Sequence, residues 1–213
     1  MLTVKTFTFN PVQENTYVLF NEAKEAIIID PGCYFKEEEQ KLKDFLESKN
    51  LKPVQLVNTH CHLDHVFGNQ FIYGTYALEL FIHPNEEQVL KFAPQTAQMW
   101  GLPFKNYDGL LHFIDANEVV KLGDDELKII LAPGHSPGSI CFYNEKQNFV
   151  IGGDVLFKES IGRTDLPGGN HAALIESIRE QLFVLPDNVI VYPGHGDPTT
   201  IGYEKKNNPF LKG

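Results

Sequence analysis

The sequence predicts an α/β (α+β) fold that forms one domain over residues 1–213. Short segments with the composition of buried strands alternate with segments of helical period, and no linker or low-complexity tract separates the two halves. Apolar residues make up 42% of the chain, which is enough to bury a sizeable core at this length. No run approaches the roughly eighteen apolar residues that a membrane-spanning helix needs, so we expect no membrane span.

The first half of the chain predicts a hairpin-rich sheet. Its expected strands are residues 2–9, 16–20, 25–30, 54–57 and 80–83. Its expected helices are residues 36–50, 67–78 and 86–92. Leu42, Phe45 and Leu46 stand at i, i+3 and i+4 of an otherwise charged segment, which indicates a surface helix packed through a narrow apolar stripe. Residues 93–108 carry few regular signals, and we expect an irregular segment that covers the site.

The second half predicts further strands and one strongly amphipathic helix. The expected strands are residues 126–131, 139–143, 149–151 and 189–191, and the expected helix is residues 172–185. Three of these strands run into a turn in which glycine precedes a histidine or an aspartate, namely His135, Asp154 and His195. Glycine lacks a Cβ and lets the backbone turn sharply, so each of these side chains can point towards a shared site.

The densest cluster of polar donors lies in residues 59–65, which read Thr-His-Cys-His-Leu-Asp-His and which we call the ligand turn. His60 and His62 are two residues apart, so in an extended segment both imidazoles leave the same face and can converge on one metal ion. Asp64 and His65 then reach towards a second metal position. The alternative is a polar loop whose histidines bind no metal. We reject it, because four crowded donors need a cation to offset their mutual repulsion.

Charge and cysteine content exclude several classes of function. The formal net charge of −10 and the pI near 5.2 argue against a nucleic-acid partner. The three cysteines lie far apart without a C-x-x-C pair, which indicates a reducing compartment, and we expect a soluble cytoplasmic protein with no membrane association. Cys61 lies between two candidate ligands but faces the other way in an extended segment, so it is expected to be a small buried residue. The oligomeric state stays open.

These motifs, in this order and over nearly the whole chain, resemble the metallo-β-lactamase fold superfamily. The resemblance implies a four-layer αββα sandwich with a two-metal site at the edge between its sheets. It implies that His60, His62 and His135 bind one metal, that Asp64, His65 and His195 bind the other, and that Asp154 bridges them. A carboxylate at the bridging position is typical of the glyoxalase II-like and lactonase branches, whereas the true β-lactamases have cysteine or serine there.

Ligands of this kind predict hydrolytic chemistry. Two divalent ions about 3.5–4 Å apart can share a water whose pKa falls from about 15.7 towards about 7, and the resulting bridging hydroxide can attack a carbonyl carbon. The metals also stabilise the oxyanion that develops. Asp64 and Asp154 are therefore the expected catalytic carboxylates. Two divalent metal ions are the expected cofactors, with zinc the default and iron or manganese accepted by the same ligands.

Three segments resemble the glyoxalase II-like (hydroxyacylglutathione hydrolase-like) proteins of the short bacterial type: residues 152–157, 162–165 and 199–210. The resemblance implies hydrolysis of a small-molecule thioester, with glutathione-derived thioesters as the first candidates. Arg163 stands where these proteins carry a basic residue that binds the glutathione carboxylate, and an internal ion pair with Asp165 is an equal alternative. His171 opens the predicted amphipathic helix and is expected either near the substrate mouth or in a helix-start role.

Two rival functions stay open. Persulfide dioxygenases of this fold also carry the Gly-Arg-Thr-Asp segment, and they use a single iron held by two histidines and an aspartate. On this sequence that triad would be His60, His135 and Asp154. The second rival is a non-catalytic, metal-bound binding domain, against which the intact ligand set argues.

Overall fold

Two six-stranded sheets, each with its own helices, dominate the computed structural model, which describes residues 1–116 and 118–212. The chain divides into two compact units. The N-terminal unit comprises Met1–Ile114 and Lys121–Asp125, and the C-terminal unit comprises Asp115–Val120 and Glu126–Gly213. The expectation of one domain over the whole chain stays a prediction. Among the described residues, no helix combines the length and the apolar character that crossing a membrane requires.

The sheet of the N-terminal unit joins an antiparallel hairpin to a parallel series of strands. The strands, in their order along the sheet, are β1 (Thr3–Phe9), β2 (Glu14–Phe20), β3 (Glu25–Ile29), β4 (Lys52–Val57), β5 (Leu80–Ile82) and β6 (Leu111–Phe113). β1, β2 and β3 pair antiparallel, whereas β3 to β6 pair parallel. The predicted hairpin is confirmed. β6 is three residues long, which is too short for its alternation to be recognised in the sequence.

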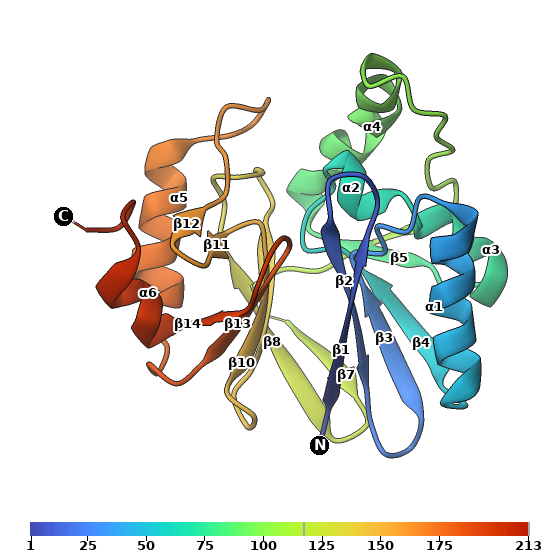
Figure 1. Ribbon diagram of the computed structural model, residues 1–213, viewed down its shortest axis with the longest axis horizontal. Helices are drawn as coiled ribbons and strands as arrows, with labels where there is room; N and C mark the ends of the chain where they lie inside the picture. Colours follow the sequence, from blue (N-terminus) through green and yellow to red (C-terminus); the bar gives the residue numbers. More distant parts are fainter. Residues whose placement is uncertain (117, 213) are drawn as a thin grey trace. The chain divides into compact units, whose positions relative to one another are not determined.

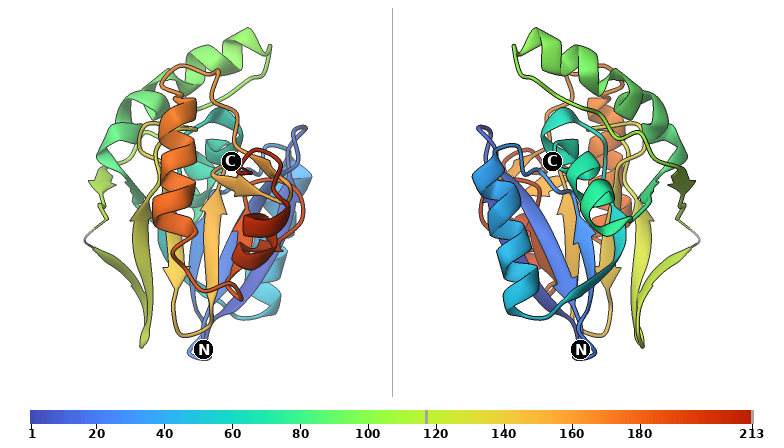
Figure 2. Two further views of the ribbon diagram at one scale, coloured as in Figure 1. Left: turned by 90° about the vertical axis from the view of Figure 1, so that its left-hand side faces the viewer. Right: turned by 90° about the vertical axis from the view of Figure 1, so that its right-hand side faces the viewer.

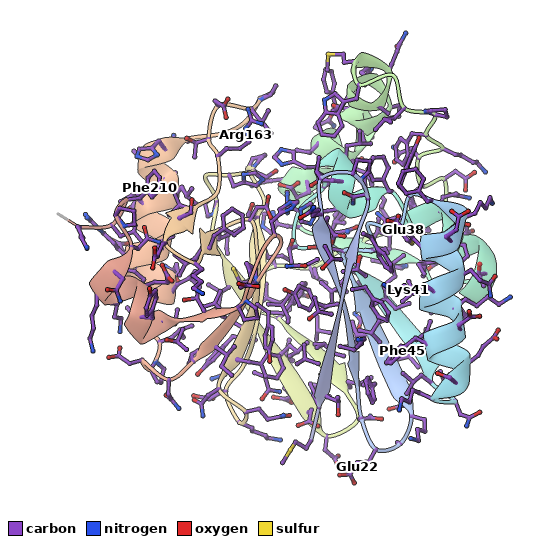
Figure 3. The ribbon with its side chains drawn as sticks, in the orientation of Figure 1. Glu22, Glu38, Lys41, Phe45, Arg163 and Phe210 are labelled. Atoms are coloured by element: carbon purple, nitrogen blue, oxygen red, sulfur yellow. The ribbon has the colours of Figure 1, made fainter. Side chains whose placement is uncertain are left out.

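The helices of this unit are α1 (Lys36–Ser48), α2 (Leu63–Val66), α3 (Asn69–Tyr76), the short 3₁₀ helix η1 (Pro84–Glu86) and α4 (Glu87–Met99). α1 and α3 cover one face of the sheet (Figure 1). The predicted stripe of α1 is confirmed, because Leu42 and Leu46 are buried in the core of this unit. Phe45 meets the Phe7 ring edge-on at 5.2 Å between ring centroids, and Figure 3 labels Phe45 on the side of α1 that faces the strands.

Helix α4 corrects one expectation. The sequence predicts a helix only over residues 86–92 and an irregular segment after it, but α4 continues through Pro94 to Met99. Pro94 has no N–H to donate to the carbonyl of Leu90, which a proline inside a helix normally leaves unsatisfied. The side chain of Asn106 donates to that carbonyl at 2.8 Å instead. Asn106, which lies outside the helix, therefore satisfies the Leu90 carbonyl and allows the helix to continue past Pro94.

The second six-stranded sheet, most of which belongs to the C-terminal unit, brings three strand ends to one edge. The strands, in their order along the sheet, are β14 (Thr199–Thr200), β13 (Ile190–Pro193), β10 (Phe149–Gly153), β9 (Ile140–Asn144), β8 (Asp125–Leu131) and β7 (Val119–Leu122). β11 (Leu156–Phe157) and β12 (Ser160–Ile161) form a separate two-stranded sheet. β10 runs parallel to β13 and antiparallel to β9, which runs antiparallel to β8. The carboxyl ends of β8, β10 and β13 therefore lie at the same edge.

One face of this sheet is covered by helices α5 (His171–Ser177), η2 (Ile178–Leu182) and α6 (Ile201–Asn207), as the left view of Figure 2 shows for α5 and α6. The helix predicted over residues 172–185 is confirmed as α5, which continues into the π-helical turn η2. Leu174 and Leu182 pack in a core cluster with Val150 and Val191 of the sheet. Helix α6 lies outside the predicted elements, because its seven residues have too little apolar pattern to be recognised.

Candidate metal centre

The ligand turn follows β4, and its two alternating histidines lie together. The His60 and His62 rings contact each other edge-on, with 4.9 Å between their centroids. Cys61, between them, is fully buried in the apolar core of the N-terminal unit, as the alternation of an extended segment predicts. The turn then winds into α2, so Asp64 and His65 project from a helical turn rather than from an extended strand.

Asp30, at the end of β3, holds the ligand turn in place. Its Oδ1 accepts from the backbone N–H of Thr59 at 2.7 Å, and its Oδ2 accepts from the Thr59 hydroxyl at 2.5 Å. Asp30 Oδ2 also lies 3.1 Å from His65 Nδ1. Because a carboxylate only accepts, His65 carries its proton on Nδ1 and keeps a lone pair on Nε2. That Nε2 lies 3.6 Å from Asp64 Oδ2.

The same carboxylate fixes the tautomer of His60 through Thr59. The Thr59 hydroxyl lies 3.1 Å from His60 Nδ1 and has a single proton, which it donates to Asp30. It must therefore accept from His60 Nδ1, and the lone pair of His60 is left on Nε2. Asp30 thus orients two of the expected ligands, yet its sequence signal, Asp-Pro-Gly after an apolar strand, predicts only a turn.

Glu14 is a second buried carboxylate beside His65 that the sequence did not single out. It is fully buried, its Oε2 accepts from the Thr16 hydroxyl at 2.9 Å, and its Oε1 lies 3.9 Å from His65 Nδ1. Burial raises the pKa of the Glu14 carboxyl well above its ordinary value, while the neighbouring His65 opposes that effect. Gly32 makes room for this carboxylate, because a Cβ there would lie 1.9 Å from Glu14 Oε2.

The C-terminal unit supplies three expected ligands from three strand ends. His135 follows β8, Asp154 follows β10 and His195 follows β13, so all three stand at one edge of the sheet. Asp154 Oδ2 lies 3.5 Å from His135 Nε2 and 3.6 Å from His195 Nε2. One carboxylate oxygen therefore faces both imidazoles.

Backbone atoms orient His135. Its Nδ1 lies 2.7 Å from the carbonyl oxygen of Arg163, and since a carbonyl only accepts, Nδ1 carries the proton and Nε2 keeps its lone pair. The approach depends on Gly162, where a Cβ would lie 1.9 Å from the backbone oxygen of Asp154 and 3.1 Å from His135 Cβ. The Gly-Arg-Thr-Asp segment thus contacts the ligands through its main chain.

The Arg163 side chain is engaged by Asp165. Its Nε and one terminal nitrogen donate to the two carboxylate oxygens of Asp165, each at 2.7 Å, and both side chains are mostly exposed. Figure 3 labels Arg163 on the loop that precedes α5. This bidentate contact lowers the pKa of the Asp165 carboxyl to about 2. His171 is exposed at the first position of α5, behind the cap that the Asn170 side chain provides.

The separations within each unit fit metal ligands. An N···O distance of 3.5 to 3.6 Å, as between Asp154 and its two histidines, is too long for a hydrogen bond. Two atoms each about 2.0–2.1 Å from one tetrahedral zinc ion lie roughly 3.4 Å apart. The Asp64 to His65 separation of 3.6 Å fits in the same way. Four expected ligands therefore lie together in the N-terminal unit, and the other three lie together in the C-terminal unit.

Comparisons with known proteins agree with these motifs over nearly the whole chain. The family profile described as "Metallo-beta-lactamase superfamily" matches residues 9–195. Hydroxyacylglutathione hydrolase GloC of Haemophilus influenzae is 38% identical over 203 residues, which cover 93% of this chain and 93% of that protein.

Solved structures match the fold equally widely. The BLEG-1 B3 metallo-beta-lactamase matches with a TM-score of 0.91 and 36% identity, over 99% of this chain and all of that one. The di-iron-bound form of TTHA1623 matches with a TM-score of 0.87 and 33% identity, over 97% of this chain and all of that one. The predicted α/β fold class of the metallo-β-lactamase type is confirmed. The chain belongs to the metallo-beta-lactamase superfamily.

Proposed function

We propose that this protein is a metal-dependent hydrolase of the glyoxalase II type, which cleaves a small-molecule thioester. In this proposal the ligand turn and the three strand-end ligands together hold two divalent ions. His60, His62 and His135 bind one ion, Asp64, His65 and His195 bind the other, and Asp154 bridges them.

One observation carries the proposal. A single oxygen of Asp154 stands at about equal distance, 3.5 and 3.6 Å, from the Nε2 atoms of His135 and His195. The family resemblance assigns those two histidines to different metals. A carboxylate that faces both is suited to bridging, and its charge offsets part of the charge of two divalent ions.

The chain's own residues prepare the site for this chemistry. Two divalent ions, when bound, would lower the pKa of a shared water and polarise the substrate carbonyl. His60, His65 and His135 each keep a lone pair on Nε2, because Nδ1 donates to a fixed oxygen. None of these three rings has to change tautomer before it binds a metal, so these donors are preorganised.

Substrate recognition is proposed for Arg163 and His171. The guanidinium of Arg163 is exposed and already holds a carboxylate, that of Asp165, in the bidentate geometry that a substrate carboxylate would use. We propose that a thioester bearing carboxylates, such as a glutathione-derived one, competes with Asp165 for this guanidinium. The identity to hydroxyacylglutathione hydrolase GloC supports that substrate class.

Zinc is the proposed metal, and iron is the alternative that the di-iron form of TTHA1623 supports.

We also propose a cytoplasmic location and no nucleic-acid or membrane partner. The location rests on the three buried cysteines, which lie far apart without a C-x-x-C pair and suit a reducing compartment, and the absence of a nucleic-acid partner rests on the net charge of −10. Fractionation of cells expressing the tagged full chain tests the location, and recovery in a membrane or secreted fraction would contradict it.

The experiment is a substrate panel run on protein purified without added metal. The panel contains a hydroxyacylglutathione thioester, a simple thioester without carboxylates, a lactone, a phosphodiester and a β-lactam, and metal content is measured on the same sample. We expect close to two divalent ions per chain and the highest kcat/KM on the hydroxyacylglutathione. Preferred cleavage of the β-lactam would contradict the substrate class.

The rival functions give different results in the same experiment. A persulfide dioxygenase would contain one iron per chain and would consume oxygen with glutathione persulfide. A binding domain would hold metal and turn over nothing in the panel. Either result would overturn the proposed hydrolysis.

A further inference from the structure

Glu86 is a fully buried carboxylate that belongs to neither the expected ligands nor the expected substrate residues. Its Oε2 accepts from the backbone N–H of Cys61 at 2.7 Å, across 25 positions of the chain. Cys61 is the residue between His60 and His62. The Glu86 carboxylate therefore contacts the main chain of the ligand turn between its first two histidines.

A buried carboxylate needs a physical reason to be there. Removing such a charge from water costs several kcal/mol unless hydrogen bonds and nearby charge compensate for it. Glu86 stands at the N-terminus of α4, whose dipole favours a negative charge, but its side chain makes no capping hydrogen bond to that helix. Helix capping therefore does not explain Glu86, whereas the bond to Cys61 links it to a distant part of the unit.

Local hydrogen bonds and a proline shape the segment that carries Glu86. Pro84 opens η1, and the His83 side chain accepts from the backbone N–H of Asn85 at 3.2 Å. The backbone N–H of Glu86 donates to the carbonyl of His83 at 2.9 Å. The carboxylate is thus presented from a fixed turn at the start of α4, and α4 packs against α2, which carries Asp64 and His65.

The bond to Cys61 acts on both neighbouring histidines. The N–H of Cys61 and the carbonyl of His60 belong to one planar peptide unit, so holding the N–H fixes the orientation of that plane. That plane ends at the Cα of Cys61, from which the chain continues to His62. A charge-assisted bond at 2.7 Å is of the stronger kind and resists rotation of the peptide.

We propose that Glu86 is a positioning residue, which helps to set the spacing and direction of His60 and His62 by holding the peptide that joins His60 to Cys61. This inference rests on the proposed function for the identity of the ligands. The inference adds a requirement that residues 59–65 do not contain themselves. These residues also need a carboxylate acceptor, which Glu86 supplies from the start of α4.

The test compares Glu86→Ala, Glu86→Gln and the matched control Glu87→Gln. Glu87 is the next residue and bonds Lys91 at the surface of α4. Metal affinity is measured by competition with a chelator, and cobalt-substituted protein is measured by its visible spectrum. We expect Glu86→Ala to lose ten- to a hundredfold in metal affinity with an altered cobalt spectrum, as for other residues that orient metal ligands. Glu86→Gln keeps an acceptor and should stay within about threefold of the wild type, as should Glu87→Gln.

A measurement without metal keeps the inference testable if Glu86→Ala does not fold. In metal-free protein the amide proton of Cys61 should be shifted downfield and protected from exchange, and Glu86→Gln should move that resonance upfield while the fold is retained. Unchanged metal affinity in Glu86→Ala, or an unmoved Cys61 amide in Glu86→Gln, would overturn the inference. If the wild type itself binds no metal, the proposed function fails instead, so the two failures are distinguishable.

Discussion

The ligand turn of the N-terminal unit and the strand-end ligands of the C-terminal unit orient their histidines by different means. In the ligand turn, buried side chains do so: Asp30 holds His65 directly and His60 through Thr59. In the C-terminal unit, the main-chain carbonyl of Arg163 does so for His135. The same requirement, a proton on Nδ1 and a lone pair on Nε2, is therefore met once by side chains and once by backbone.

This difference predicts which substitutions should disturb each half of the proposed site. A site whose histidines are held by carboxylates loses that support when a charge is removed. A site held by backbone tolerates side-chain exchange at the holding residue and fails when the close approach of two chain segments is blocked. The two halves should therefore differ in how they respond to a change of the side chain at the residue that holds the histidine.

The largest effect is expected from Gly162→Ala. The new Cβ would lie 1.9 Å from the backbone oxygen of Asp154, so the chain must move at both His135 and Asp154. We expect a loss of about 3 kcal/mol in the free energy of unfolding, measured by urea denaturation, together with reduced metal content. The control is Gly74→Ala in α3, where a Cβ meets nothing within 4 Å and stability should rise by up to about 1 kcal/mol. Equal stability of the two variants would contradict the close-approach account.

A large effect on metal binding is expected from Asp30→Asn. Asparagine keeps the shape and tolerates the left-handed backbone at this position, where φ is 48°, but it removes the charge that holds both histidines. We expect metal affinity to fall ten- to a hundredfold, measured by chelator competition. Asp44→Asn, on the exposed face of α1, is the matched control and should change nothing. If Asp30→Asn bound metal with the affinity of the wild type, the charge of this carboxylate would not be needed to hold the ligand turn.

These contrasts show what the sequence could and could not predict. His60 and His62 could be placed together because alternation is local, and the strand ends that carry His135, Asp154 and His195 could be read from short apolar runs followed by glycine. The roles of Asp30, Glu14 and Glu86 could not be predicted, because each acts on a residue at least 25 positions away.

The continuation of α4 through Pro94 could not be predicted for the same reason. The carbonyl of Leu90, to which Pro94 cannot donate, accepts instead from the distant side chain of Asn106. One of the two roles of Arg163 could be predicted from the sequence, and the other could not. Its side chain forms the ion pair with Asp165 that the sequence offered as one of two alternatives. Its carbonyl, which orients His135, carries no side-chain signal at all.

A moderate effect on substrate affinity is expected from the pair Arg163→Gln and Asp165→Asn. Because Arg163 holds His135 through its carbonyl, both variants should keep full metal content. For a thioester bearing carboxylates, we expect Arg163→Gln to raise KM about tenfold with little change in kcat, since a charge-assisted bond to the substrate is lost. Asp165→Asn should lower KM, because the guanidinium is released from its internal partner. For a thioester without carboxylates, neither variant should move KM, and a shift there would assign Arg163 to a structural role.

The smallest effect is expected in the acid titration of Asp165. Its carboxyl pKa is lowered to about 2 by Arg163, below the value of an unfolded chain near 3.9. The pair therefore stabilises the fold above about pH 4 and loses that contribution as the pH falls towards 2. Both side chains are mostly exposed, so the stabilisation is small. Carboxyl NMR should find Asp165 still ionised at pH 3, and Arg163→Gln should return its midpoint towards 3.9.

The central claim is that Asp154 joins the two sets of ligands into one two-metal site, and cobalt titration of metal-free protein tests it most directly. Asp154→Ala is compared with Asp187→Ala, a surface aspartate that pairs with Lys205. We predict two equivalents of cobalt and full thioester turnover for the wild type and for Asp187→Ala. We predict fewer bound equivalents and no measurable turnover for Asp154→Ala. Retention of both metal ions and the full rate in Asp154→Ala would contradict the account.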